Sequence, residues 1–342
     1  MVKVDGPPRP PRSGKKKDWQ WQYGIWLGGT AFSVLFACAA VLVSPEQGLL
    51  ETLVNDQSVI DHVNLNARTW RAGAARFFEG WRLGEMQRLG GISVSQANGI
   101  PDCMLPASVE LPKSFDARKK WPACFAHVYD MGNCSASWAI AVAGALSKRF
   151  CIASPKDYGG LRLSPQQLLS CEPLSRGCGG GALDTVFGYL KNKGLVSEPC
   201  FPYQADDSVA CSLCEEEPKR LASVCRVANL RQEIFLNGPV VAPVLLLNDF
   251  LVYRSGIYQE TRTASPLVDR DRQRQLQAVT VLGWGVSEAS VEYWIIENAW
   301  GQDWGENGYA KIAVGDVPKK RGILLEEFVF AGTPLNPKVL FG

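Results

Sequence analysis

Residues 132–150 read GNCSASWAIAVAGALSKRF, and this stretch decides the fold. From Ala136 to Phe150, small and apolar residues stand all round a helical projection of the sequence. A helix that is apolar all round is buried, whereas a surface helix carries a polar face. The stretch therefore predicts a central helix that is buried in the core.

The chain after this helix changes from helical patterns to strand patterns. Ser164, Pro165 and Gln167 supply an N-cap, a proline at the first helical position and a glutamine three residues after the cap, which predicts a helix start. A further helix is predicted over residues 183–193, where Gly194 ends it. Strands are predicted at residues 240–246, 279–283, 292–297 and 308–313. A helical half followed by a strand-rich half predicts an α+β protein of two lobes.

The composition is that of a folded protein without a nucleic-acid partner. The 342 residues are 46% hydrophobic and 20% charged, with a net charge of +2. Residues 1–22 carry six Lys or Arg and two Asp, a charge of +4, which leaves −2 for the rest of the chain. A nearly neutral body without a clustered basic face gives nucleic acid no electrostatic attraction. We expect no nucleic-acid partner and no cofactor.

An uncharged stretch near the N-terminus predicts a membrane anchor. Residues 23–43 carry no charge over 21 positions, which is about 31 Å of helix, the thickness of a bilayer core. Lys15, Lys16 and Lys17 precede the stretch and favour a cytoplasmic tail over residues 1–22, with the rest luminal (endosomal or lysosomal) or extracellular. A cleaved signal peptide is the alternative, because Ala37-Cys38-Ala39 would suit a signal peptidase.

The cysteines agree with a luminal or extracellular main domain. Of eleven cysteines, Cys38 lies in the uncharged stretch and the other ten follow it, an even number in a compartment where disulfides persist. Zinc is the competing interpretation, but Cys211 and Cys214 form a lone CxxC without a second such pair at finger spacing. We therefore expect disulfides and no metal site.

The segment 45–91 is too small to be a domain of its own. The segment 45–91 has apolar residues at helical spacing, and Trp70-Arg71-Ala72-Gly73 follows its first helical patterns. Gly90-Gly91 and residues 101–106 are typical of an extended linker.

Several segments in a fixed order carry a resemblance to a known family. They are LPKSFDAR (111–118), GNCSASW (132–138), GCGGG (177–181), FLNGPV (235–240), DFLVYRSG (249–256) and NAWGQDWGENGY (298–309). Together they resemble cathepsin B within the papain family of cysteine peptidases, over about residues 47–334. The resemblance implies a papain-like fold with a helical left lobe, a β-barrel-like right lobe and a peptide-binding cleft between them.

The resemblance also implies a domain map. Residues 111–334 would form the papain-like domain and residues 335–342 a C-terminal tail. Residues 44–110 resemble a propeptide through Trp70-Arg71-Ala72-Gly73, and in zymogens of the family such a segment lies in the cleft and blocks it. A chain that cannot cleave itself would keep this pro-like segment.

The catalytic positions that the resemblance implies have mostly been replaced. The family nucleophile, a cysteine, corresponds to Ser137, and the catalytic base, a histidine, corresponds to Gln277. The oxyanion glutamine corresponds to Met131, and only the orienting Asn298 is retained. The implied cleft keeps its neighbours, which are Trp138, Gly179, Gly180, Gly181 and Trp300.

These replacements remove the means of proton transfer. A serine hydroxyl is a weak nucleophile without an adjacent base, and a glutamine amide does not titrate near neutral pH. The chain offers only two histidines, His62 and His127, of which His127 is the alternative base. We interpret it as a packing or surface residue.

The resemblance implies four disulfides, Cys124–Cys151, Cys134–Cys178, Cys171–Cys211 and Cys200–Cys214. It leaves Cys103 and Cys225 over, and the spacing does not decide whether these two pair with each other. Cathepsin B relatives carry two histidines in an occluding loop, but residues 201–210 contain none, so their dipeptide-trimming specificity is not expected here. The charged residues 269–275 form either a binding loop over the cleft or a solvated loop.

Three functional hypotheses remain. The first is an inactive, membrane-tethered homologue that binds a peptide or protein in the cleft or on an exposed face. The second is a residual peptidase with Ser137 as nucleophile. The third is a structural subunit whose cleft is permanently filled by residues 47–110.

Overall fold

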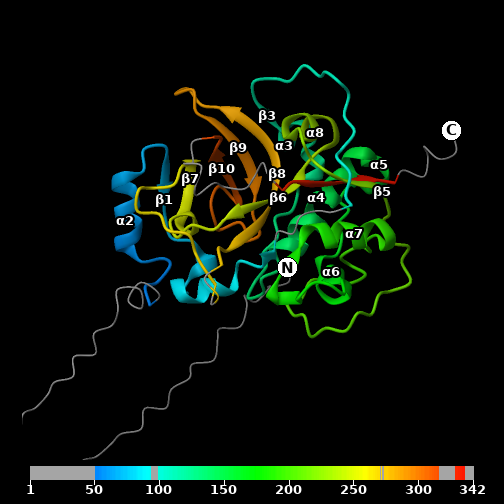
Figure 1. The fold of residues 1–342 in the computed structure, drawn as a ribbon, viewed down its shortest axis with the longest axis horizontal. Coiled ribbons are helices and arrows are strands. Elements are labelled where there is room, and N and C mark those ends of the chain that lie inside the picture. Colours follow the sequence, from blue (N-terminus) through cyan, green and yellow to red (C-terminus); the bar gives the residue numbers. More distant parts are fainter. Residues whose placement is uncertain (1–50, 94–98, 270, 272, 316–327, 336–342) are drawn as a thin grey trace, which may run out of the picture. The chain divides into compact units, whose positions relative to one another are not determined.

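The computed structural model describes residues 51–93, 99–269, 271, 273–315 and 328–335 (Figure 1). The chain divides into two units, Met1–Gly48 and Leu49–Gly342, and every described residue belongs to the second. The expected cytoplasmic tail (1–22), the expected anchor (23–43) and most of the C-terminal tail lie outside the described residues. Among the described helices, none has the length and apolarity needed to cross a membrane.

The predicted central helix is present as α4 (Ser137–Ala153). It is buried from Ser137 to Cys151, and even the side chains of Lys148 and Arg149 are only 5% and 1% exposed. Both cations are paired, Lys148 Nζ with Glu297 at 2.8 Å and Arg149 Nη2 with Glu233 at 2.6 Å. Pairing is what makes buried charge tolerable, since an unpaired charge in the core is strongly destabilising.

The other helices of this lobe surround α4. The start of α6 (Pro165–Cys171) is the predicted one, with Ser164 Oγ accepting from the Gln167 backbone N–H at 3.0 Å. The bounds of α7 (Leu183–Lys193) are also those predicted, and Gly194 ends it at φ 70°, a conformation that favours glycine. The remaining helices are α3 (Ala117–Lys120), α5 (Pro155–Tyr158) and α8 (Leu230–Asn237).

Nine of the described strands form one sheet in the order β1-β7-β10-β9-β8-β6-β11-β5, with β3 pairing β8, and β2 and β4 form a second, two-stranded sheet. Four strands match the predictions, namely β6 (Val240–Leu245), β8 (Leu276–Val286), β9 (Glu292–Glu297) and β10 (Tyr309–Ala313). The strands of this sheet that were not predicted are β1 (Trp70–Ala72), β3 (Phe115–Asp116), β5 (Leu221–Arg226), β7 (Tyr253–Tyr258) and β11 (Phe330–Pro334).

The expected β-barrel-like closure is wrong for the described strands. The sheet ends at β1 on one side and β5 on the other, and these two strands do not pair with each other. The α+β class and the papain-like pairing of a helical lobe with a strand-rich lobe are confirmed. The helix α4 packs against β8, which places the start of α4 beside the middle of the sheet (Figure 1).

The pro-like segment folds with the papain-like domain. Its described elements are α2 (Gln57–Asn66), β1 (Trp70–Ala72), the 3-10 turns η1 (Arg76–Phe78) and η2 (Leu83–Arg88), and β2 (Ile92–Ser93). Strand β1 extends the large sheet by pairing with β7, and β2 pairs with β4 (Gly181–Ala182) in parallel. Buried apolar side chains of this segment belong to the same core as α4 and β8.

All four disulfides implied by the resemblance are present, and Cys103–Cys225 is a fifth. The two cysteines of the lone CxxC therefore belong to different disulfides, Cys211 with Cys171 and Cys214 with Cys200. Five disulfides agree with a domain that folds in an oxidising, luminal or extracellular compartment.

Candidate active site

The position of the family nucleophile is the first residue of α4. Ser137 is fully buried, and the residue before it, Ala136, offers no side chain to cap the helix. The Ser137 hydroxyl oxygen accepts a hydrogen bond from the backbone N–H of Ala278 at 3.2 Å. This bond joins the helical lobe to β8, so Ser137 serves as a contact between the lobes.

The position of the family base carries an amide that is fixed in place. Gln277 lies on β8, is fully buried, and donates from Nε2 to Asn298 Oδ1 at 3.0 Å. Asn298 Oδ1 also accepts from the Ala299 backbone N–H at 2.8 Å. The retained asparagine therefore orients the residue at the base position, and what it orients is a neutral amide.

The position of the oxyanion glutamine is filled by an apolar side chain. Met131 is fully buried, and its Sδ lies 3.9 Å from Gln277 Nε2. The Met131 backbone donates to the Ala299 carbonyl at 2.9 Å and accepts from the Tyr203 hydroxyl at 2.8 Å. A thioether has no hydrogen to donate, so this side chain cannot stabilise an oxyanion. Tyr203 was not predicted, because nothing local in the sequence marks it as a neighbour of this loop.

Three buried polar atoms of this corner have no hydrogen-bond partner among the described residues. They are Gln277 Oε1, Asn298 Nδ2 and the Trp300 indole N–H. An unpaired buried polar group costs about 1–3 kcal/mol, so such groups are few in native proteins. The corner retains a polar arrangement without a group that can take up a proton.

The glycine run on the opposite side of the cleft lies against the pro-like segment. The Gly181 N–H donates to the Gly91 carbonyl at 2.7 Å, and a Cβ on Gly180 would lie 2.0 Å from the same oxygen. Trp138 closes the floor, with its indole N–H donating to the Gly177 carbonyl at 3.2 Å and its ring 2.8 Å from a Cβ built on Gly181. A side chain on Gly180 would therefore push the segment out, and one on Gly181 would collide with Trp138.

The pro-like segment crosses the cleft between the lobes at Gly90 and Gly91. A Cβ on Gly91 would lie 2.7 Å from the Ser135 carbonyl, and one on Gly90 would lie 1.9 Å from the Gln275 side chain. Gly90-Gly91 was predicted as part of an extended linker, and the two residues do lie outside helices and strands, between η2 and β2. The pair is a close backbone contact across the catalytic positions, and the sequence signal is the pair of glycines itself.

Trp300 anchors the same segment by aromatic packing. Its ring is fully buried, lies 5.0 Å from Phe78 in an edge-to-face arrangement and stacks at 6.2 Å on Phe77. Such pairs contribute about 0.5–1.5 kcal/mol beyond the area they bury. The resemblance predicted Trp300 as a cleft residue, but no sequence pattern predicted its two partners.

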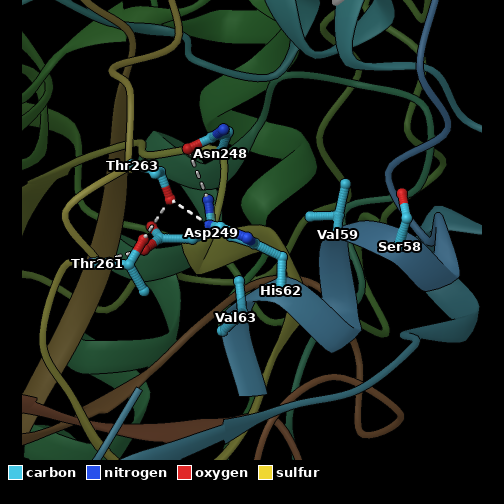
Figure 2. Close-up of a pocket in the computed structure, with 8 residues that line it drawn as sticks. All are labelled: Ser58, Val59, His62, Val63, Asn248, Asp249, Thr261 and Thr263. Atoms are coloured by element: carbon cyan, nitrogen blue, oxygen red, sulfur yellow. Dashed lines mark hydrogen bonds between the residues drawn. The ribbon is translucent and has the colours of Figure 1, made fainter. Parts of the chain in front are cut away.

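Neither histidine contacts the catalytic positions. His62 Nε2 lies 3.0 Å from Thr263 Oγ1 and lines a pocket of about 380 Å³ between α2 and a loop that carries Asn248 and Asp249 (Figure 2). The His127 ring packs edge-on against Tyr129 at 4.5 Å, where burial and then the charge of Arg162 lower its pKa. The chain therefore has no imidazole beside Ser137.

Two loops were expected to bear on specificity, residues 201–210 and the charged loop that follows Val268. Residues 201–210 pack on the glycine run, where Asp207 Oδ2 accepts from the Cys178 N–H at 2.8 Å. The charged loop that follows Val268 is turned back by a bond from Asp269 N–H to the Gln273 carbonyl at 2.9 Å, and it leads to Gln275 beside Gly90. That this charged loop binds a partner stays a prediction.

Comparisons with known proteins agree with this geometry. Residues 111–328 match the family model described as papain family cysteine protease. The chain is 31% identical over 295 residues to human tubulointerstitial nephritis antigen, covering 75% of this chain and 62% of that protein, so it spans less than two thirds of this relative. It is 30% identical over 275 residues to cathepsin B-like CP3 of Giardia intestinalis, covering 75% of this chain and 87% of the relative.

Among solved structures, procathepsin B S9 of Trypanosoma congolense superimposes with a TM-score of 0.72 at 28% identity, over 83% of this chain and all of that one. That structure is a proform, and the likeness extends over more of this chain than the papain-like domain alone. The chain belongs to the papain family of cysteine peptidases, as a cathepsin B-like homologue.

Proposed function

We propose that this chain is a catalytically inactive cathepsin B-like homologue that holds a polypeptide in its cleft without cutting it. The observation that carries the proposal is the hydrogen bond from Gln277 Nε2 to Asn298 Oδ1. At the two positions that the resemblance assigns to the base and to its orienting residue, this chain carries two amides. Neither amide takes up a proton between pH 4 and pH 8.

The size of the loss supports inactivity over slow turnover. Removing one member of a serine protease triad costs about a million-fold in kcat, and removing an oxyanion donor costs about 10²–10³. Here the nucleophile, the base and the oxyanion side chain have all been replaced, at Ser137, Gln277 and Met131. The Ser137 oxygen is also engaged by Ala278, which opposes its use as a nucleophile.

The polypeptide that the cleft holds in this structure is the chain's own pro-like segment. This favours a second candidate function, a structural subunit whose cleft stays filled. Phe78 and Met86 are fully buried, and Leu89 is 2% exposed. An external peptide or protein ligand would have to displace these side chains or bind an outer face.

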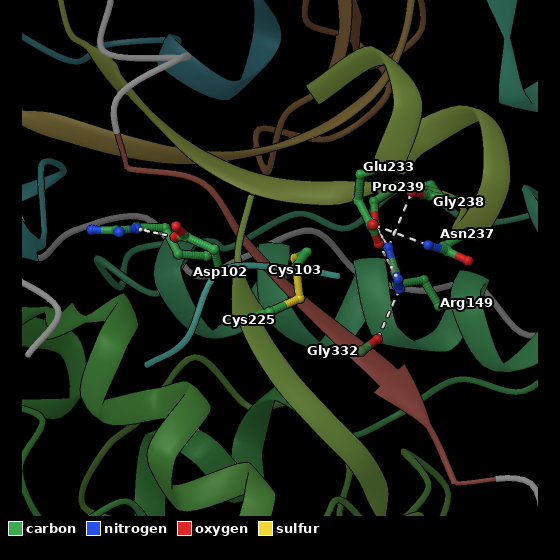
Figure 3. The surroundings of a disulfide bond; sticks show 10 residues. Asp102, Cys103, Arg149, Cys225, Glu233, Asn237, Gly238, Pro239 and Gly332 are labelled. Atoms are coloured by element: carbon green, nitrogen blue, oxygen red, sulfur yellow. Dashed lines mark hydrogen bonds and ion pairs between the residues drawn. A yellow bond between two sulfur atoms is a disulfide. The ribbon is translucent and has the colours of Figure 1, made fainter. Parts of the chain in front are cut away.

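A covalent link supports retention of the segment. The bond Cys103–Cys225 ties the C-terminal part of this segment to β5, beside an ion pair between Asp102 Oδ1 and Arg226 Nε at 2.8 Å (Figure 3). The exposed residues that follow Cys103 begin at Met104, which is 99% exposed and accessible to a processing enzyme. A cut there would leave the pro-like segment attached through the disulfide.

The uncharged residues 23–43 and the basic tail before them support a membrane tether with the papain-like domain on the luminal or extracellular side. Alkaline carbonate extraction of cells that express the full chain should leave it in the membrane pellet. A soluble protein with a new N-terminus near Ala40 would instead support a cleaved signal peptide.

The test of inactivity is a fluorogenic-peptide assay on the purified full chain from pH 4 to pH 8, together with labelling by a cysteine-directed epoxide. We expect neither turnover nor labelling. Turnover that is lost in Ser137→Ala would establish the residual peptidase and contradict this proposal. A pull-down under non-reducing conditions, with and without the pro-like segment, would separate the two binding hypotheses.

A further inference from the structure

The loop that precedes α4 contains a tripeptide with the pattern of a covalent modification site. Asn133-Cys134-Ser135 fits the pattern Asn-x-Ser/Thr of N-linked glycosylation, in which x is not proline. No other asparagine of the 342 residues is followed two positions later by Ser or Thr. The pattern is short, so it needs support from exposure and compartment.

The structure places the acceptor at the surface. Asn133 is exposed in a turn between Met131 and α4, and its amide makes no hydrogen bond with the described residues. The turn is held by its neighbours, since the Gly132 N–H donates to Asp130 Oδ1 at 2.8 Å and Gly132 adopts φ 61°. A bulky group on Asn133 Nδ2 would therefore break no contact of the fold. The five disulfides provide the compartment, because they form where glycosylation also occurs.

We propose that Asn133 carries an N-linked oligosaccharide. The Asn133 amide nitrogen attacks the anomeric carbon of an oligosaccharide held on a lipid diphosphate. The new C–N bond forms as the C–O bond to the diphosphate breaks, the lipid diphosphate leaves with the electron pair, and the amide loses one proton. The inference rests on the luminal placement in the proposed function but not on catalytic inactivity.

A glycan on Asn133 would affect access to the cleft. Ser135 lies against Gly91, and the Met131 carbonyl is held by Tyr203, so Asn133 stands at the rim where the pro-like segment crosses. An oligosaccharide there would shield this rim from a folded protein. It would still leave the extended pro-like segment in its place across the cleft.

The middle and last residues of the tripeptide limit when the transfer can occur. In the folded protein Cys134 is 1% exposed and bonded to Cys178, and Ser135 is 3% exposed. The transfer must therefore precede closure of this disulfide. Cys178 is made 44 residues after Cys134, which at about 5–20 residues per second leaves about 2–9 s. Occupancy is thus set by competition between glycosylation and disulfide formation.

The test is expression of the full chain in animal cells, followed by digestion with peptide N-glycosidase. We expect a one-glycan shift in mobility, lost in Asn133→Gln and retained in Asn192→Gln, which changes an exposed asparagine outside any such tripeptide. Mass spectrometry should show Asn133 converted to Asp by the enzyme.

Two variants test the competition. Ser135→Thr keeps the tripeptide and Cys178→Ser removes the partner of Cys134, and both should raise the glycosylated fraction, read on total protein so that folding does not matter. An unshifted wild type with oxidised cysteines would overturn the glycan and leave the proposed function standing. An unshifted wild type with free thiols would overturn both the glycan and the luminal placement.

Discussion

The catalytic corner and the pro-segment contact lie in the same cleft and have opposite properties. The corner of Ser137, Gln277 and Asn298 has lost its titratable groups and leaves polar atoms unpaired. The contact with the pro-like segment is closely packed, from the backbone bond of Gly181 with Gly91 to the rings of Phe78 and Trp300. The difference supports the proposed function, in which the cleft holds a polypeptide and does not transfer protons.

The positions that the resemblance assigns to catalysis also hold the fold together. Ser137 accepts from Ala278, and Gln277 donates to Asn298, so each substituted position joins two elements. Each hydrogen bond of this kind makes a net contribution of about 0.5–1.5 kcal/mol to the free energy of unfolding. Ser137 makes a contact between the lobes and Gln277 makes one within the strand-rich lobe, and this comparison can be tested from both sides.

The largest effect should come from restoring the chemistry. We expect Ser137→Cys, Gln277→His and Met131→Gln together to produce thiol-dependent cleavage of short peptides, because Asn298 is already placed to orient the new imidazole. Activity should stay well below that of a natural relative, since errors of about 1 Å in position are costly. The measurement is turnover of a fluorogenic peptide with and without a thiol-reactive inhibitor.

The pro-like segment must be removed for this test. Cys103→Ser combined with an engineered cleavage site among residues 104–110 would release it, because the covalent tie is then absent. The matched control is Ser137→Cys alone, which has a thiol but no proton donor for the leaving amine. A folded triple variant that is freed of the segment and neither cleaves peptide nor reacts with an epoxide would show that the cleft geometry has drifted.

The sequence predicted the parts of this comparison that depend on local pattern or on family motifs. The buried helix α4 follows from apolar residues on all sides, and the positions of Ser137, Gln277 and Asn298 follow from their motifs. The sequence did not predict β7, because Arg254, Ser255 and Gly256 do not alternate in polarity. Its strand character comes from pairing with β1 and β10.

Contacts between distant segments were beyond the sequence pattern. Gly90-Gly91 has the composition of a linker, and only the approach of Gly180 and Gln275 explains why both residues lack a side chain. Phe78 reaches Trp300 across more than two hundred residues, and no periodicity encodes such a pair. Cys103 and Cys225 were the two cysteines left over, and the spacing did not decide that they pair with each other.

The next largest effect is expected at the packed side of the comparison. Phe78→Ala should lower the free energy of unfolding by about 3–5 kcal/mol, because Phe78 is fully buried and its loss leaves a cavity against Trp300. Chemical denaturation measured by tryptophan fluorescence would test this, with half-buried Phe77→Ala as the milder control. A change below about 1 kcal/mol would indicate that the pro-like segment is detached in solution.

A smaller loss is expected from the covalent tie. Cys103→Ser with Cys225→Ser should lower the free energy of unfolding by about 2–4 kcal/mol, because the bond closes a loop with a sequence separation of 122. Limited proteolysis within residues 104–110 gives a second measurement. The cut wild type should stay joined on a non-reducing gel, and the cut variant should separate into two fragments. Separation of the cut wild type without reductant would contradict retention of the segment.

The smallest effect is expected at Ser137 and concerns stability alone. Ser137→Ala should cost about 1–3 kcal/mol of unfolding free energy, because it leaves the Ala278 N–H buried without its acceptor. The unfolding free energy of Ser137→Cys should lie between those of the wild type and Ser137→Ala, since a thiol is a weaker acceptor of the same shape. Thermal unfolding of the three proteins would rank them. If Ser137 were a residual nucleophile with no structural role, Ser137→Ala would instead leave the stability unchanged and abolish a measurable turnover, and the catalytic corner would no longer contrast with the packed contact beside it.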